Sequence, residues 1–376
     1  MTPSMTPMKR LIAIVVAVFA CPSLVSAGAI RVFLADQGDN AGYNNRIIEI
    51  DPFRTRTPPT PEDGNAIVLR TIPSPAARFL DELSFDGDRR LWCIVKNDGE
   101  QTLDGATLID PESGAILRQI YPFILGHVYG SFLEGVAWDG DGLWVSGVRS
   151  TTAGDPNGNV LTRVDPFTGQ RTVPFTVGTL APVQMCRIPG NIAQGLLFEP
   201  GGAHGYLWHS DIGLNRLYKL DLARLYDLDP GNDNNLATAQ FAVPFRPKGM
   251  AWMGSTIWVT SPWNQNDNDP GKNGVWEFNP QTGGTRQLFR TPNWNLDGIA
   301  IAQFPTYPKD LDGDRDVDLD DFRLFHLCFN GPNSAPSALC TVDADFDTDG
   351  DVDLVDFGRF VSCFNGVNRP PACDPE

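Results

Sequence analysis

Two stretches of the chain place aspartate at nearly every second position, and an apolar segment follows each of them. The stretches are DLDGDRDVDLDD, residues 310–321, and DFDTDGDVDLVD, residues 345–356. Calcium prefers six to eight hard oxygen ligands, and a 12-residue loop supplies them from positions 1, 3, 5, 7 and 12, often with water at position 9. Both stretches fit this spacing. The sequence therefore predicts two calcium loops.

The two predicted loops differ at the sharp turn of position 6, where the second has Gly350 and the first has Arg315. A non-glycine residue held at positive φ costs on the order of 1 kcal/mol. We therefore expect two ions, of which the first loop binds its own more weakly. The predicted ligands of the second loop are Asp345, Asp347, Asp349, the Asp351 carbonyl, Asp353 and Asp356. Those of the first are Asp310, Asp312, Asp314, the Asp316 carbonyl, Asp318 and Asp321.

Each copy of the loop segment also carries a pair of cysteines. Cys328 and Cys340 follow the first loop, and Cys363 and Cys373 follow the second. Four cysteines allow three connectivities, and the repeat symmetry favours the local pairing within each copy. In the preceding region Cys93 and Cys186 lie in different repeats, and we expect buried thiols there in preference to a bridge.

The segments DLDGDRDVDLDDFRLFHLCFNGPN and DFDTDGDVDLVDFGRFVSCFNGVN match almost position for position. Over residues 310–376 this tandem arrangement resembles a dockerin, a small α-helical calcium-binding module with EF-hand-like loops, known as the partner of cohesins on extracellular assemblies. Familiar dockerins contact cohesin through a Ser-Thr type pair at loop positions 10 and 11. Here those positions hold Leu319-Asp320 and Leu354-Val355. The resemblance therefore implies a cohesin-like or other extracellular protein partner, contacted through a more apolar and acidic surface.

The region before the loops repeats a different pattern, which predicts strands. Alternating apolar and polar residues bounded by Gly, Asp and Pro are typical of half-buried strands and their turns. Each repeat predicts four short strands, which is the number of strands in a propeller blade. The aligned segments are LSFDGDRRLWCIV (83–95), VAWDGDGLWVSG (136–147), LLFEPGGAHGYLWHSD (196–211) and MAWMGSTIWVTS (250–261).

The two ends of this region are incomplete in complementary ways. VFLAD (32–36) and IIEIDPF (47–53) match the second and third strands of a blade, and residues 298–302 match a first strand. Joined, these segments would complete one more blade and close the ring, which removes exposed sheet edges. The sequence therefore predicts an all-β, five-bladed β-propeller, with six blades as the alternative if one is hidden in the long fourth repeat.

The repeat pattern resembles the broad propeller superfamily of NHL-type repeats, gluconolactonase and regucalcin-like proteins, and streptogramin lyase. The resemblance covers most of residues 30–303 and implies a fold more than a function, because this architecture hosts binders, enzymes and scaffolds. Gluconolactonase-like relatives place a metal-binding carboxylate where a first strand enters the channel. The resemblance therefore makes Glu134, Asp81 and Asp297 candidate catalytic residues, or parts of a channel site for a metal ion or a small ligand. The alternative is that the entry residues hydrogen-bond across a water-filled channel. The five aligned entry residues are Asp81, Glu134, Gln194, Lys248 and Asp297.

The N-terminal segment predicts export. Lys9-Arg10 precede the apolar run LIAIVVAVFA, and small residues follow at 25–27, which is typical of a cleavable signal too short to span a bilayer. A loose lipoprotein box at residues 18–21 is the alternative. The net charge of −17 argues against nucleic acid and anionic lipid as partners.

The sequence thus predicts a signal peptide (1–27), a β-propeller (28–303), a linker (304–309) and a dockerin-like domain (310–376). We expect a secreted or cell-surface-associated calcium-binding adaptor whose propeller recognises an extracellular glycan or protein. The alternative is a propeller hydrolase or lyase acting on polysaccharide or lactone, with the dockerin-like module as its targeting appendage. The adaptor is favoured because no catalytic set is legible in the sequence.

Overall fold

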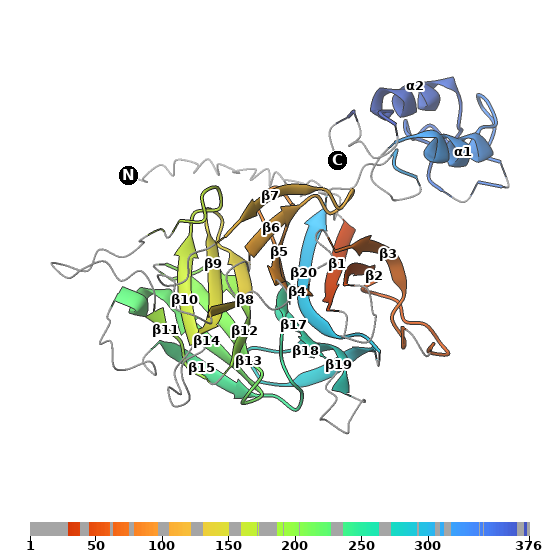
Figure 1. The fold of residues 1–376 in the computed structure, drawn as a ribbon. Helices are drawn as coiled ribbons and strands as arrows, with labels where there is room; N and C mark the ends of the chain where they lie inside the picture. The colour runs from red at the N-terminus through yellow and green to blue at the C-terminus, as the bar shows by residue number, and fades with distance from the viewer. Residues whose placement is uncertain are drawn as a thin grey trace, which may run out of the picture. The chain divides into compact units, whose positions relative to one another are not determined.

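The computed structural model describes a large part of the chain, which folds into two compact units (Figure 1). One unit is Ala29–Phe304, and Pro305–Glu376 belongs to the other. The predicted signal peptide lies outside the described residues. The described residues are 29–37, 45–60, 63–74, 79–96, 105–121, 131–149, 159–170, 172, 186–190, 192–202, 204–226, 236–262, 272–291, 293–304, 309–311, 317–337, 339–340, 342–366 and 372–373.

The larger unit contains five antiparallel sheets of four strands each, which are the blades of a propeller. Blade 1 is β20 (Leu296–Phe304), β1 (Ala29–Asp36), β2 (Arg46–Ile50) and β3 (Val68–Pro73). Blade 2 is β4 (Phe79–Phe85), β5 (Leu91–Lys96), β6 (Gly105–Ile109) and β7 (Ile116–Ile120). Blade 3 is β8 (Ser131–Trp138), β9 (Leu143–Arg149), β10 (Asn159–Val164) and β11 (Cys186–Arg187).

Blade 4 is β12 (Ala193–Glu199), β13 (Tyr206–Asp211), β14 (Arg216–Asp221) and β15 (Ala237–Ala242), with the 3-10 turn η1 (Leu222–Tyr226) after β14. Blade 5 is β16 (Met250–Met253), β17 (Thr256–Ser261), β18 (Gly274–Phe278) and β19 (Thr285–Arg290). The four aligned sequence segments are the first hairpins of blades 2 to 5. The prediction of five blades is therefore confirmed, and the long fourth repeat forms one blade.

Blade 1 closes the ring with strands from both ends of the propeller. Strand β20 pairs with β1 in antiparallel register, with Leu34 opposite Ile299 and Phe33 opposite Ala300. In Figure 1 the pale blue β20 lies beside the red β1. The complementary incomplete ends of the repeat region predicted this closure, and the prediction is confirmed.

The propeller core consists of five apolar clusters, one between each pair of neighbouring blades. Each cluster receives a large aromatic side chain from the second strand of one blade, packed against the first strands of the next. For example, Trp92 of blade 2 packs with Val136 and Val145 of blade 3. Because both faces of a blade pack against neighbours, a middle strand such as β6 is buried along its whole length, whereas the outer strand β3 is partly exposed. The five aromatic residues are Phe33, Trp92, Trp144, Trp208 and Trp258.

The inner strands are the first strands of the five blades, β20, β4, β8, β12 and β16, and they approach one another closely around the axis. A glycine follows the entry residue in four of them, at Gly135, Gly195, Gly249 and Gly298. A Cβ atom on Gly298 would lie 2.3 Å from the Asp81 carbonyl oxygen, closer than a real Cβ atom comes to another atom. Hydroxyl groups add a second tie between blades, since Ser210 Oγ donates to the Lys248 carbonyl at 2.6 Å and Thr260 Oγ1 to the Asp297 carbonyl at 3.1 Å.

The smaller unit contains two short helices, α1 (Leu319–Cys328) and α2 (Leu354–Cys363). Each begins with a capping box. The carboxylate of the aspartate before the helix accepts from backbone N–H groups of the first turn, and the carboxylate of an aspartate in that turn accepts from the N–H of the capping aspartate. No helix in the described part of the chain is long and apolar enough to cross a membrane. The core of this unit includes Val317, Phe325, Val352 and Phe360, with both α-helices contributing.

The two halves of the smaller unit bond to each other in the same way. Asn330 N–H donates to the Val352 carbonyl at 3.1 Å, and Asn365 N–H donates to the Val317 carbonyl at 3.0 Å. Each loop therefore holds the segment that follows the helix of the other copy. This reciprocal pairing is the structural counterpart of the sequence duplication.

We predict that Gly298→Ala lowers the free energy of unfolding of the propeller by about 3 kcal/mol, because its Cβ meets backbone atoms that cannot rotate away. All nine tryptophans lie in the propeller sequence, so their fluorescence during denaturant unfolding measures this unit. Gly87→Ala is the matched control, since its Cβ meets only the Trp138 indole at 3.9 Å. Equal stability of the two variants would contradict the close approach at the axis.

Candidate functional site

The second predicted calcium loop gathers its carboxylates into two adjacent groups. One oxygen from each of Asp345, Asp347 and Asp349 lies within 4.8 Å of the others, and Asp351, Asp353 and Asp356 form a second group by the same measure. Asp347 Oδ1 is buried and accepts no hydrogen bond. Desolvation, followed by the charges of Asp349 and Asp356, raises the pKa of Asp347. A cation would relieve this repulsion, so the donor set fits a hard divalent ion such as calcium.

The loop backbone is shaped by the same aspartates. Asp345 Oδ2 accepts from the Gly350 N–H at 2.8 Å, and Gly350 has a φ of 94°, which glycine adopts without strain. Asp356 Oδ1 accepts from the Phe346 N–H at 2.7 Å, and its Oδ2 accepts from the Asp353 N–H at 2.8 Å. Position 12 therefore ties the start of the loop to the start of α2.

The described part of the first loop has the same construction. Asp321 Oδ1 accepts from the Leu311 N–H at 2.6 Å, and its Oδ2 accepts from the Asp318 N–H at 2.8 Å. These bonds match those of Asp356 atom for atom. Asp312, Asp314, Arg315 and Asp316 lie outside the described residues. The prediction that Arg315 weakens this site stays a prediction.

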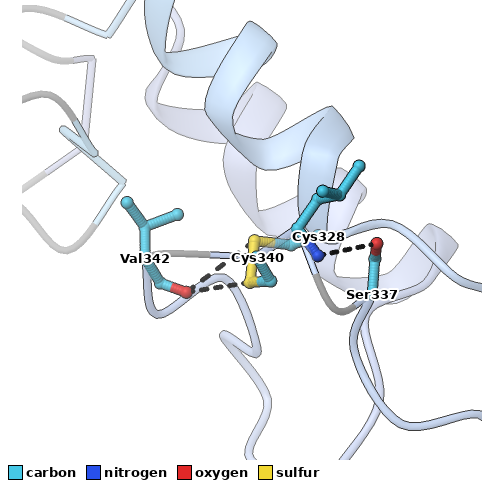
Figure 2. The surroundings of a disulfide bond; sticks show 5 residues. Cys328, Ser337, Cys340 and Val342 are labelled. Carbon is cyan, nitrogen blue, oxygen red and sulfur yellow. Dashed lines mark hydrogen bonds between the residues drawn. A yellow bond between two sulfur atoms is a disulfide. The ribbon is translucent and has the colours of Figure 1, made fainter.

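Both predicted disulfides are present in the smaller unit. Cys328 pairs with Cys340 and Cys363 pairs with Cys373, and both pairs close the end of a helix onto the segment after it. Figure 2 shows the first pair, with both sulfur atoms near the Val342 carbonyl oxygen. The Ser337 N–H donates to the Cys328 carbonyl at 3.3 Å. In the propeller Cys93 is a buried free thiol, as predicted, and burial raises its pKa to about 12. The side chain of Cys186 lies outside the described residues.

The residues at loop positions 10 and 11 leave apolar side chains exposed. Leu319 is 69% exposed and Leu354 is 72% exposed, and these two residues occupy equivalent first positions of α1 and α2. Val355 is 54% exposed beside Leu354. In a unit with so small a core, large aliphatic side chains left in water at duplicated positions are candidates for partner contact.

The propeller axis holds an ion cluster that joins three of the five predicted entry residues. Lys248 Nζ lies 2.6 Å from Asp297 Oδ1 and 3.8 Å from Asp81 Oδ1. Both aspartates are 2% exposed, while Glu134 and Gln194 are 9% and 7% exposed on the next inner strands. The ammonium group of Lys248 lies next to both carboxyl groups and supplies positive charge at this point of the ring.

Sequence reasoning missed Glu82, which is the residue after the entry position of blade 2. Its side chain is 1% exposed, and the N–H of Leu83 donates to Oε1 at 3.2 Å. Its Oε2 lies against Gly195 of blade 4. Burial raises the pKa of Glu82 well above its ordinary value, although backbone N–H groups including those of Ile299 and Met250 oppose the shift. The carboxyl group of Glu82 thus extends from blade 2 across the axis toward blades 1, 4 and 5.

The sequence signal that could have identified Glu82 is that it replaces a glycine of the repeat pattern. The other four inner strands have glycine at this position, and blade 2 alone has a side chain there. One carboxyl group can occupy the space at the axis that four glycines leave. A repeat alignment that tracks the position after each entry residue would have marked it.

Blade 5 contains two tryptophans, Trp263 and Trp276, that could stack on sugar rings, and the described one, Trp276, is engaged by neighbouring protein groups. Trp276 stacks on Phe245 with ring centroids 4.6 Å apart, and its indole N–H donates to the Lys272 carbonyl at 2.9 Å. Trp263 lies outside the described residues. Trp276 therefore adds no support to a glycan over a protein as the propeller's ligand.

No family model and no curated protein sequence matches the chain. Among solved structures, a Bacteroides caccae protein of unknown function is 11% identical, with a TM-score of 0.42 and coverage of 73% of this chain and 99% of that chain. The PQQ-bound aldose sugar dehydrogenase of Streptomyces coelicolor is 17% identical, with a TM-score of 0.36 and coverage of 68% and 76%.

Virginiamycin B lyase of Staphylococcus aureus is 17% identical, with a TM-score of 0.30, and the alignment covers 57% of this chain and 56% of the lyase. These likenesses are too low to carry an argument about activity. The propeller assignment rests on the strand order of this chain.

We predict that replacing Cys328 and Cys340 together by serine destabilises the smaller unit by roughly 3 kcal/mol, because the closed loop no longer restricts the unfolded chain. The α-helices of the described chain lie in this unit, so the helical circular dichroism signal measures its unfolding. Cys93→Ala in the propeller is the control and should leave the helical transition unchanged. A double variant with wild-type helical stability would show that the disulfide does not support the fold.

Proposed function

We propose that this protein is an exported calcium-binding adaptor. Its C-terminal unit binds calcium through two loops and attaches to an extracellular protein partner, and its propeller recognises a separate extracellular ligand. The observation that carries the proposal is the geometry of residues 345–356, where six aspartates of one loop form two oxygen-rich groups at the start of a capped helix.

Calcium binding would stabilise the smaller unit by neutralising its concentrated negative charge. In the second loop Asp345, Asp347 and Asp349 would supply side-chain oxygens and Asp356 would complete the site next to α2. The Asp356 bonds to the loop backbone keep its carboxylate in place for this role. The atom-for-atom match at Asp321 supports a second ion at residues 310–321.

Attachment would use the exposed side chains at the start of the two helices. Leu319 and Leu354 present equivalent aliphatic surface next to the calcium loops, and Val355 extends it. A calcium-dependent contact follows from this arrangement, because the loop positions that bind the ion lie directly before the helix positions that are exposed. The dockerin-like sequence pattern supports an extracellular, cohesin-like partner of apolar character.

A second candidate function is hydrolase or lyase chemistry at the propeller axis. One observation favours it, which is that burial raises the pKa of Asp297 to about 8, with the charge of Lys248 opposing the shift and that of Asp81 adding to it. A carboxyl group that keeps its proton near neutral pH can act as a general acid. Against this role, Asp81 and Asp297 are 2% exposed and hold Lys248, so a substrate would have to displace these contacts.

We predict that the full-length protein binds two calcium ions and that the double variant Asp345→Asn, Asp347→Asn weakens the tighter site by roughly 100-fold or more, because calcium affinity depends on the number of charged ligands. Isothermal titration of the chelator-treated protein measures both sites. Asp141→Asn is the control, since this propeller side chain is 94% exposed. Heat of binding that is the same in all three proteins, or absent from the wild type, would refute the calcium site.

We also predict that the double variant Leu319→Ser, Leu354→Ser keeps its calcium affinity but loses calcium-dependent attachment to extracellular proteins, because it removes apolar contact area without touching a ligand. The measurement is capture on the immobilised full chain with calcium and with chelator. Leu69→Ser on propeller strand β3 is the control, because Leu69 is 55% exposed. The neighbouring Val68 is not suitable, because it packs against the core. Equal capture by wild type and double variant would contradict the proposed contact.

A further inference from the structure

The second predicted calcium loop is held by a segment of the other copy. Val352, at loop position 8, is buried, and its carbonyl oxygen accepts from the Asn330 and Gly331 N–H groups, both at 3.1 Å. The residue before it, Asp351, is 6% exposed, and its Oδ2 accepts from the Asn333 N–H at 2.5 Å. The segment after α1 therefore contacts two consecutive loop residues, one through its side chain and one through its backbone.

These contacts restrict the direction of one carbonyl group. The predicted ligand at position 7 is the Asp351 carbonyl, which belongs to the peptide between Asp351 and Val352. The carboxylate of Asp351 is held on one side of this peptide, and the carbonyl of Val352 is held on the other. The Asp351 N–H also donates to Asp349 Oδ1 at 3.2 Å, which joins position 7 to the predicted ligand at position 5. A ligand group that is already oriented loses less freedom when an ion binds.

The segment that makes these contacts has little apolar burial of its own. Its exposed residues include Pro332, Asn333, Ala335, Pro336 and Leu339. Exposed side chains restrict the backbone only weakly, because they give up little contact with water. Covalent closure and local hydrogen bonds must therefore supply much of the restraint.

The Cys328–Cys340 disulfide closes this segment at both ends (Figure 2). Inside the closed segment, Asn330 Nδ2 donates to the Ala335 carbonyl at 2.8 Å, and the Ser337 N–H donates to the Cys328 carbonyl at 3.3 Å. The disulfide thus restrains the N–H groups that meet the second loop.

The other disulfide has the reciprocal arrangement. Cys363 pairs with Cys373, and in the segment that they close the Asn365 and Gly366 N–H groups donate to the Val317 carbonyl at 3.0 and 3.2 Å. Val317 is position 8 of the first predicted loop. Each disulfide therefore closes a segment that contacts the loop of the other copy.

We infer that the Cys328–Cys340 disulfide positions the calcium loop of the other copy, residues 345–356, because the segment that it closes sets the direction of the Asp351 carbonyl. The inference rests on the calcium binding proposed above and adds a determinant of affinity to it. Asp351 is a positioning residue, since its side chain orients its own carbonyl through Asn333. The second site then has its full affinity only in the disulfide-bonded protein.

Calcium titration of full-length proteins tests this assignment one site at a time. The double variant Asp310→Asn, Asp312→Asn disables the first loop and leaves the second site to be measured. The double variant Asp345→Asn, Asp347→Asn disables the second loop and leaves the first. Each of these two backgrounds then receives the cysteine substitutions.

We expect Cys328→Ser, Cys340→Ser to weaken the second site by about tenfold or more and the first site much less, because only the second loop loses a restraint that orients it. Cys363→Ser, Cys373→Ser is the matched control and should show the reverse preference. If the first pair of substitutions weakens the first site as much as the second, or more, the inference is overturned.

The same titrations separate this inference from the proposed function. A wild-type protein that binds no calcium would overturn both. Two bound ions whose affinities neither cysteine pair changes would overturn the positioning role of the disulfides and leave the calcium sites intact.

A comparison at Asp351 does not depend on the disulfide. Asp351→Ala and Asp351→Asn remove the same charge, but only asparagine keeps an oxygen that accepts from the Asn333 N–H. In the background that retains the second loop, we expect the alanine variant to bind calcium about threefold to tenfold more weakly than the asparagine variant, which is the effect of one hydrogen bond. Equal affinities would overturn the positioning role of Asp351, and this comparison decides the matter if the cysteine variant does not fold.

Discussion

The propeller depends on how closely its five inner strands approach one axis. Four glycines make this approach possible, and at Gly298 even one added carbon would overlap the backbone of the neighbouring blade. The aromatic clusters between the blades can form only when the inner strands are this near, because each cluster draws on two adjacent blades. Closure by β20 against β1 then makes the five contacts mutually dependent.

The same constraint explains the unusual chemistry of the axis. Side chains at the strand entries are largely buried, so much of their charge is met within the ring. Lys248 meets Asp297 and Asp81, and backbone N–H groups meet Glu82. The contacts that the structure shows for Lys248, Asp81 and Asp297 join neighbouring blades of the closed ring. A catalytic or ligand-binding role would have to operate through this buried network.

Much of the fold could be predicted from the sequence because it follows from local patterns that repeat. Strand alternation, the turn residues and the complementary ends specify five blades, and duplication specifies the loops, helices and disulfides. Glu82 could not be placed in this way. Its direction across the axis depends on a register irregularity between Leu80 and Leu83, which periodicity does not reveal. The pairing of Lys248 with Asp297 likewise depends on the spacing of two blades, which no local pattern contains.

We propose that calcium organises the C-terminal unit, whereas the propeller is held closed by its own residues. Hydrogen exchange of the full-length protein, with calcium and with chelator, tests both parts of this proposal in one measurement. The account predicts that chelation speeds exchange in the loops and in α1 and α2, including the N–H groups of Asn330 and Asn365 that join the two copies. Exchange in β1 and β20 should not change. Identical protection of α1 and α2 with and without calcium would contradict the account.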